Sequence, residues 1–139
     1  MDDCYPNAMR RFLLWAPPVA YMLLIFYSSS QSDPAPVLTR AVWDKLLHTG
    51  GYALLAILFC RALRGEGLTL VATVLAAIVL TSIYGASDEW HQAFTPMRSS
   101  DIHDWIADTT GAIAGAFLFV IAIRTRLQAT AVKAVERGR

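Results

Sequence analysis

The sequence holds few cysteines and no concentrated basic face, and each shortage excludes a class of protein. Its 139 residues include two cysteines, Cys4 and Cys60. Both fall on the side of the chain that the charge pattern assigns to the cytoplasm, where disulfides are rare, so we expect two free thiols. The net charge is only +1, and without a basic face the chain is not expected to bind nucleic acid.

Long apolar blocks dominate what is present, since 55% of the residues are hydrophobic and about half or less is usual in soluble proteins. The blocks lie at residues 12–27, 46–63, 68–85 and 102–123. A membrane-spanning helix needs roughly 20 residues, and the first block reaches this length if residues 28–30 extend it. A soluble bundle would carry charges along one face of each helix, whereas the first and third blocks have none. We therefore predict an all-α integral membrane protein with four transmembrane helices.

The predicted organisation is one membrane domain at residues 12–124, between a cytoplasmic lead at 1–11 and a basic cytoplasmic tail at 125–139. The spans are placed at about 12–30, 46–63, 68–87 and 102–123. Most Lys and Arg residues fall on one side: Arg10, Arg11, Arg61, Arg64, Arg124, Arg126, Lys133, Arg137 and Arg139. Because Lys and Arg accumulate in cytoplasmic loops, both termini are predicted in the cytoplasm and the two long connections outside.

Ionisable residues concentrate between residues 84 and 108, at the edge of the predicted membrane. This stretch contains Asp88, Glu89, His91, Arg98, Asp101, His103, Asp104 and Asp108. Ionisable groups at a bilayer edge are costly and indicate a functional site. The charge pattern places the cluster on the outer face.

Two motifs at helix ends each have a functional and a structural interpretation. Asp44 and His48 share a face at the start of the second helix, because residues four apart are neighbours. Asp44 is predicted to orient His48 for proton transfer or ligand binding, or to pair with it for packing alone.

Near the end of the third helix, Asp88, His91 and Gln92 are predicted to share a face with Tyr84, with Glu89 at the flank. Such a set suits acid–base chemistry or a divalent metal. The alternative is an exposed polar helix end.

Three aspartates begin the fourth helix. Asp101 is a good N-cap, and Asp104 occupies a capping-box-like position. Asp108 lies a turn further in and shares a face with Asp104, so two carboxylates are predicted to point into the bundle. Lys45 and Arg98 are the nearest counter-charges.

Small residues follow on the same helix. Ala107, Gly111 and Gly115 are spaced four apart, a pattern that lets membrane helices approach closely. We predict that this stripe packs against the second helix, with Gly50 and Gly51 receiving it.

Together these motifs resemble the VanZ-like family of small bacterial membrane proteins. The resemblance covers about residues 12–124 and rests on Asp44-Lys-Leu-Leu-His48 with Gly51-Tyr52, on Tyr84-Gly-x-x-Asp88-Glu-x-His91-Gln92 with Pro96-x-Arg98, and on Asp101-x-x-Asp104-x-x-x-Asp108 with Gly111. It implies a multi-pass protein of the bacterial cytoplasmic membrane. It also implies a link to low-level teicoplanin resistance, while the family's biochemical activity is not established.

The leading hypothesis is an outward-facing site that engages a lipid-linked or otherwise anionic envelope component, or a glycopeptide. Its candidate binding residues are Lys45, Arg98, Asp44, Gln92, Asp101 and Asp104. A second hypothesis is a metal-dependent enzyme acting on a lipid-linked or phosphorylated substrate, with Asp88, His91, Asp104 and Asp108 as candidate ligands. The carboxylates suit magnesium or manganese, and His91 leaves zinc open.

Whether the cluster is catalytic stays open at the level of sequence. The candidate catalytic residues are Asp88, Glu89, His91, Asp108 and His48. A third hypothesis is structural: the cluster pins the helices together and the protein is an assembly partner, including with copies of itself. No cofactor other than a divalent metal is expected.

Overall fold

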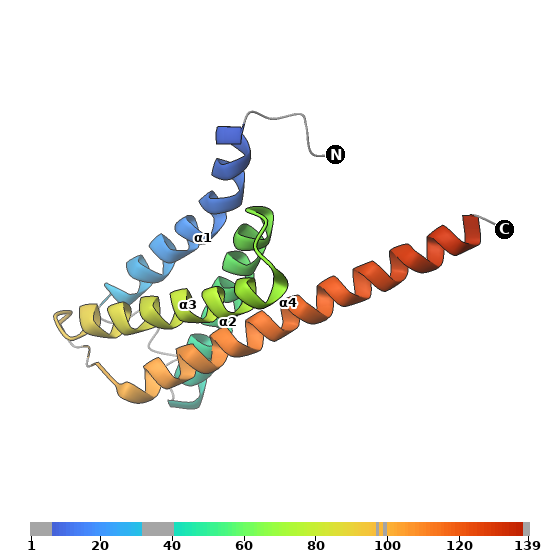
Figure 1. Cartoon of the computed structure of the whole chain (residues 1–139). Helices are drawn as coiled ribbons and strands as arrows, with labels where there is room; N and C mark the ends of the chain where they lie inside the picture. The colour runs from blue at the N-terminus through green and yellow to red at the C-terminus, as the bar shows by residue number, and fades with distance from the viewer. Residues whose placement is uncertain (1–6, 32–40, 97, 99, 138–139) are drawn as a thin grey trace.

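The computed structural model describes residues 7–31, 41–96, 98 and 100–137. Within this part of the chain the elements are all helices: α1 (Asn7–Ser29), α2 (Ala41–Gly65), α3 (Leu70–Gln92) and α4 (Ile102–Arg137) (Figure 1). Each is long and apolar enough to cross a membrane. The prediction of an all-α protein with four candidate membrane spans is therefore confirmed, and the sidedness of its termini stays a prediction.

The four helices overlap the four predicted spans and extend past several of their ends. Thr69 caps α3 by accepting a hydrogen bond from the Ala72 amide at 3.3 Å. Gly67, with φ of +93°, makes the tight turn between α2 and α3, a backbone conformation that favours glycine. Pro17 and Pro18 lie inside α1, and Figure 1 shows that this helix bends along its length. The basic tail continues α4 as a helix to Arg137.

Helix α2 is the centre of the bundle. Its most extensive packing is against α4; α3 lies against both of them, and α1 rests mainly on α2 with a slight contact to α3 (Figure 1). The start of α4 runs beside α2 and α3, and its C-terminal part projects beyond the bundle (Figure 1). This arrangement brings the starts of α2 and α4 to the same end as the end of α3.

Close packing of α2 on α4 depends on two glycines. A methyl group on Gly111 would lie 2.9 Å from the carbonyl carbon of Thr49 and 3.0 Å from its Cα, and closer still to the carbonyl oxygen. A methyl group on Gly115 would lie 2.8 Å from the corresponding atoms of Ala53. Absence of these Cβ atoms lets the two backbones meet, as small residues do at helix contacts in membranes. The predicted approach of α4 to α2 is confirmed.

The predicted receivers of the glycine stripe were wrong. Nothing lies within 4 Å of a Cβ built on Gly50, and a Cβ on Gly51 would meet only the Tyr21 hydroxyl, at 3.6 Å. Thr49 and Ala53 receive the stripe because they lie four apart on the face of α2 that meets α4.

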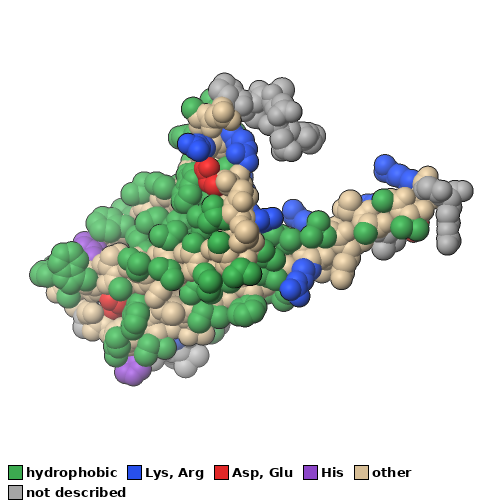
Figure 2. Space-filling view, in the orientation of Figure 1, with side chains coloured by type: hydrophobic (Ala, Val, Ile, Leu, Met, Phe, Trp, Pro, Cys, Tyr) green, Lys and Arg blue, Asp and Glu red, His purple; other side chains and the backbone are tan. Residues whose placement is uncertain are grey.

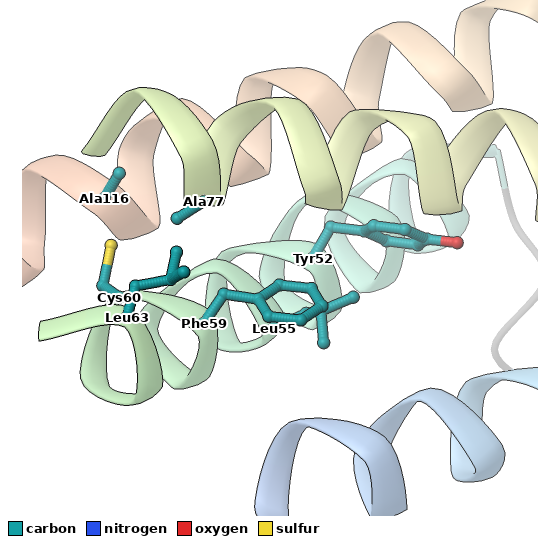
Figure 3. Close-up of a cluster of buried hydrophobic side chains, with 7 residues drawn as sticks. All are labelled: Tyr52, Leu55, Phe59, Cys60, Leu63, Ala77 and Ala116. Carbon is teal, nitrogen blue, oxygen red and sulfur yellow. The ribbon is translucent and has the colours of Figure 1, made fainter. Parts of the chain in front are cut away.

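The buried core is small and lies mostly on one face of α2 (Figure 3). Its members are Tyr52, Leu55, Phe59, Cys60, Leu63, Ala77 and Ala116. Cys60 is a free, fully buried cysteine, as predicted, whereas Cys4 lies outside the described residues. Large apolar side chains instead cover the outside, among them Leu23, Val71, Ile83, Phe117 and Ile121. Such an apolar exterior is suited to contact with the lipid chains of a membrane.

Most basic side chains lie at one end of this apolar surface, and the acidic cluster lies at the other. Figure 2 shows Lys and Arg around the start of α1, the α2–α3 turn and the projecting part of α4. Histidine and an acidic side chain appear at the opposite end of the bundle (Figure 2). The polar cluster predicted from the sequence therefore lies at the end away from most of the basic residues.

Candidate functional site

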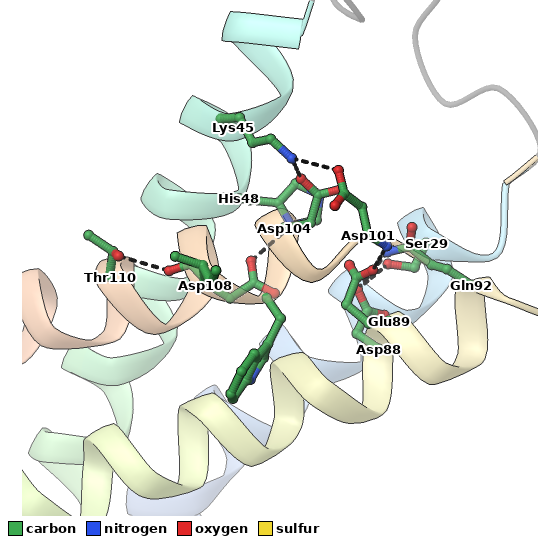
Figure 4. A network of polar contacts seen from close by, with 12 residues as sticks. Ser29, Lys45, His48, Asp88, Glu89, Gln92, Asp101, Asp104, Asp108 and Thr110 are labelled. Atoms are coloured by element: carbon green, nitrogen blue, oxygen red, sulfur yellow. Dashed lines mark hydrogen bonds and ion pairs between the residues drawn. The ribbon is translucent and has the colours of Figure 1, made fainter. Parts of the chain in front are cut away.

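Polar side chains from several helix ends meet at one end of the bundle (Figure 4). The starts of α2 and α4 and the ends of α1 and α3 contribute them. The main members are Ser29, Lys45, His48, Asp88, Glu89, Gln92, Asp101, Asp104 and Asp108. All of them except Ser29 were among the candidates predicted from the sequence.

Lys45 joins α2 to the start of α4. Its ammonium group pairs with Asp104 Oδ1 and, at 3.3 Å, with Asp101 Oδ2. Asp101 caps α4 as predicted, because its Oδ1 accepts from the His103 amide at 2.9 Å. The capping box is not closed by Asp104, since the Asp101 amide donates instead to Glu89 Oε2 at 2.7 Å. The start of α4 is thus held by both α2 and α3.

Asp101 lies just before the membrane-spanning part of α4. The backbone N–H of His103 holds the pKa of Asp101 down to about 2, with further contributions from the His103 ring and from Lys45. The His103 Nδ1 lies 2.8 Å from Asp101 Oδ1. Asp101 is therefore ionised at any physiological pH, and its role as the N-cap of α4 accounts for its low pKa.

His48 and Asp108 form a contact between α2 and α4. His48 Nδ1 lies 2.8 Å from Asp108 Oδ1, and the Asp108 side chain is completely buried. The His48 ring also lies parallel to that of Tyr52, with centroids 6.3 Å apart. A Cβ on Gly85 of α3 would lie 2.9 Å from Asp108 Oδ2. Glycine at this position therefore provides the space that the carboxylate occupies.

A second group of contacts ties the end of α3 to the end of α1. Asp88 Oδ2 accepts from Ser29 Oγ at 2.8 Å and from Gln92 Nε2 at 3.1 Å. His91 Nε2 lies 3.0 Å from Ser30 Oγ. Asp88 and Gln92 are each 3% exposed, which excludes the interpretation of this segment as an exposed polar helix end.

The face predicted for the end of α3 is confirmed in part. Tyr84 lies on the same side as Asp88 and His91, since its hydroxyl donates to the Met22 carbonyl of α1 at 2.5 Å. Glu89, placed at the flank by the sequence, instead turns toward α4, where it is only 5% exposed.

Three side chains of three helices have the geometry of a metal-binding group. Potential ligand atoms of His48, Glu89 and Asp104 all lie within 4.8 Å of one another. In the described part of the chain this is the one such group. It shares only Asp104 with the set predicted from sequence, which was Asp88, His91, Asp104 and Asp108. Asp88 and His91 are directed to α1 instead.

Several buried polar atoms at this end lack a hydrogen-bond partner among the described residues. They are Asp88 Oδ1, Glu89 Oε1, Arg98 Nε, Asp108 Oδ2 and the Tyr52 hydroxyl. Lys45 meets the predicted role of counter-charge, whereas Arg98 makes no ion pair within the described structure. Buried polar groups are nearly always satisfied in folded proteins, so this concentration of exceptions is a property of the site.

Sequence reasoning missed Ser29, Ser30 and Gly85. The serines follow the first apolar block, and only the extension of that block to residue 30 pointed to them. Gly85 stands in the Tyr84-Gly-x-x-Asp88 motif, but nothing in the sequence indicated that it provides the space beside Asp108. The side chain of Asp44 lies outside the described part of the structure.

Four apolar helices with an enclosed acidic site at one end define a small polytopic membrane protein. The family model VanZ/LLP1 matches residues 7–123. The chain therefore belongs to the VanZ/LLP1 family. Comparison with curated proteins and with solved structures gave no match.

Proposed function

We propose that this VanZ-family protein resides in the bacterial cytoplasmic membrane and engages a polar, phosphorylated component of the cell envelope. Its termini lie in the cytoplasm and its acidic site faces outside. Support comes from the segregation of basic residues at the opposite end of the bundle (Figure 2) and from the rule that Lys and Arg mark the cytoplasmic side. A reporter enzyme that works only in the cytoplasm should therefore be active when it is fused to the C-terminus, and a reporter that works only outside the membrane should be inactive there.

The observation that carries the proposal is the set of buried polar atoms without partners. Glu89 has one carboxylate oxygen without a partner among the described residues, and Arg98 has a buried N–H that likewise lacks one. Leaving such a group unsatisfied costs about 1–3 kcal/mol. A ligand that carries both hydroxyl or amine donors and an anionic group would satisfy both kinds of atom. Envelope precursors, with sugars and phosphates on a lipid, have this chemistry.

Exposed aromatic side chains support a position at the membrane surface. Trp90 and Phe94 are 71% and 73% exposed and contact each other at the end of α3. Aromatic residues gather where the bilayer meets water. The site would therefore lie at the depth of lipid headgroups, within reach of a lipid-linked ligand.

Glycopeptide susceptibility provides the test in cells. We expect expression of the wild-type chain to lower teicoplanin susceptibility, and Asp108→Asn and Arg98→Ala to abolish the effect at normal membrane levels. Thr110→Ala is the control, because Thr110 is exposed on the same helix and its hydroxyl bonds only the Ile106 carbonyl. If both site variants still lower teicoplanin susceptibility as much as wild type does, a role for the site is refuted. Loss of the protein from the membrane in both would favour the structural assembly role instead.

A further inference from the structure

The charge of the site conflicts with direct binding of an anion. Among the described side chains at this end of the bundle, five carboxylates accompany one lysine and one arginine, which gives these seven residues a net charge of −3. The residues are Asp88, Glu89, Asp101, Asp104, Asp108, Lys45 and Arg98. Four of the carboxylate side chains are buried, and buried charges need compensation. An anionic headgroup would be repelled unless a cation is already present.

We propose that His48, Glu89 and Asp104 bind one divalent metal ion, and that this ion receives the phosphate of the envelope ligand. Only the second clause rests on the proposed function. The three residues come from α2, α3 and α4, and their ligand atoms lie within 4.8 Å of one another. Binding of the ion would therefore join three helices at this end of the bundle.

A buried, unsatisfied ligand atom distinguishes this group from an ordinary acidic cluster. Glu89 is 95% removed from solvent, given its 5% exposure, and its Oε1 has no partner among the described residues. Its other oxygen, Oε2, is held by the Asp101 amide. The carboxylate is thus held by one oxygen and unsatisfied at the other, as expected of a residue that can bind a metal ion.

Neighbouring residues hold the other two ligands in place. Lys45 holds Asp104 through Oδ1. Asp108 holds His48 through Nδ1 at 2.8 Å, and we assign Nε2 of that ring to the ion. A histidine ligand almost always donates its second N–H to a carboxylate or carbonyl, which fixes the ring and raises its basicity. Asp108 is accordingly a positioning residue, and Gly85 provides the space for it.

The donor set selects the kind of ion and leaves it open to a ligand. One imidazole and two carboxylates suit Mn²⁺ or Zn²⁺, whereas Mg²⁺ favours oxygen ligands. Three protein ligands are typical of sites that keep coordination positions for water or substrate. A divalent ion would reduce the net charge of the cluster from −3 to −1. Together with Arg98 it would present positive charge to a phosphate.

Metal titration of the full-length chain in detergent tests the metal site. After chelator treatment, we expect wild type and Thr110→Ala to bind one Mn²⁺ or Zn²⁺ per chain, with a rise in melting temperature because the ion binds only the folded state. Glu89→Gln should lose stoichiometric binding. Asp108→Asn should bind about 10- to 100-fold more weakly, the usual effect of removing the partner of a histidine ligand. No bound ion in folded wild type, or unchanged affinity in Glu89→Gln, would overturn the site.

Spectroscopy keeps the test decisive if a variant does not fold. Pulsed electron paramagnetic resonance of Mn²⁺-loaded wild type should show coupling to one imidazole nitrogen. A bound ion without nitrogen coupling would exclude His48 as a ligand and overturn the assignment.

A further measurement separates the metal site from the proposed function. Native mass spectrometry would compare a polyprenyl phosphate with inorganic phosphate, each with and without Mn²⁺. We expect metal-dependent retention of the lipid, lost in Arg98→Ala. Retention of inorganic phosphate alone would assign the site to a soluble phosphate. The protein could bind one metal ion per chain and yet retain neither phosphate, while its expression leaves the teicoplanin susceptibility of cells unchanged. That result would uphold the metal site and refute the proposed function.

Discussion

Substitution of Gly111 by alanine should separate α4 from α2 and destabilise the bundle. The added methyl group would lie 2.9 and 3.0 Å from backbone atoms of Thr49. These atoms belong to a helix backbone and cannot rotate aside as the end of a side chain does, so the helices must move apart. Overpacking of this kind costs about 1–3 kcal/mol. Alanine is also a better helix former than glycine by about 1 kcal/mol, which partly offsets the cost.

Gly50→Ala is the matched control, because it makes the same substitution on the facing helix where nothing lies within 4 Å of the new Cβ. Helix propensity favours both variants equally, so it cancels when they are compared. We expect Gly111→Ala to unfold with a free energy about 1–3 kcal/mol lower than Gly50→Ala, measured by equilibrium unfolding in mixed micelles with circular dichroism. Equal stability of the two variants would refute the close approach of α2 and α4.

Two further predictions concern Asp101 and Cys60. Titration of Asp101 by nuclear magnetic resonance should give a pKa of about 2, and His103→Ala should raise it only in part, because this variant removes the ring contact but keeps the backbone N–H. Because the pKa of the folded state is the lower one, the stabilisation by Asp101 is complete above about pH 4 and is lost as the pH falls toward 2; an unchanged pKa in His103→Ala would contradict the contribution of the His103 ring. Cys60 is fully buried, so in a Cys4→Ser background a water-soluble maleimide should modify it only after denaturation, and rapid labelling of the folded protein would show that the core is open.

The membrane fold was predictable because its signal is local. The apolar blocks indicated all four helices, and the uncharged blocks at 12–27 and 68–85 excluded a soluble amphipathic bundle. The helices run beyond the predicted spans, since α1 begins at Asn7 and α4 ends at Arg137. Hydropathy marks only the part of a helix that matches the hydrocarbon layer. It does not report where the helix itself stops.

The site was predictable in composition but not in its partners. Residue spacing placed Asp104 and Asp108 together on α4, and both are buried, at 7% and 0% exposure. Spacing within one helix does not tell which neighbouring helix faces a side chain. Glu89 was therefore placed at the flank although it meets the start of α4. Likewise, Gly50 and Gly51 were chosen as receivers because they are small, whereas the contact is set by the faces of two crossing helices.

Helix electrostatics separates the carboxylates that the fold itself explains from those it does not. Asp101 and Asp104 lie at the start of α4, where the positive end of the helix dipole favours negative charge, and both also pair with Lys45.

Asp88 and Glu89 lie near the end of α3, where the same dipole disfavours negative charge by about 0.3–1 kcal/mol for each group. Both are buried, and each has an oxygen without a partner in the described structure. Hydrogen bonds from Ser29 and Gln92 to Asp88, and from the Asp101 amide to Glu89, stabilise one oxygen of each carboxylate. The divalent ion proposed between α2, α3 and α4 would place positive charge next to Glu89.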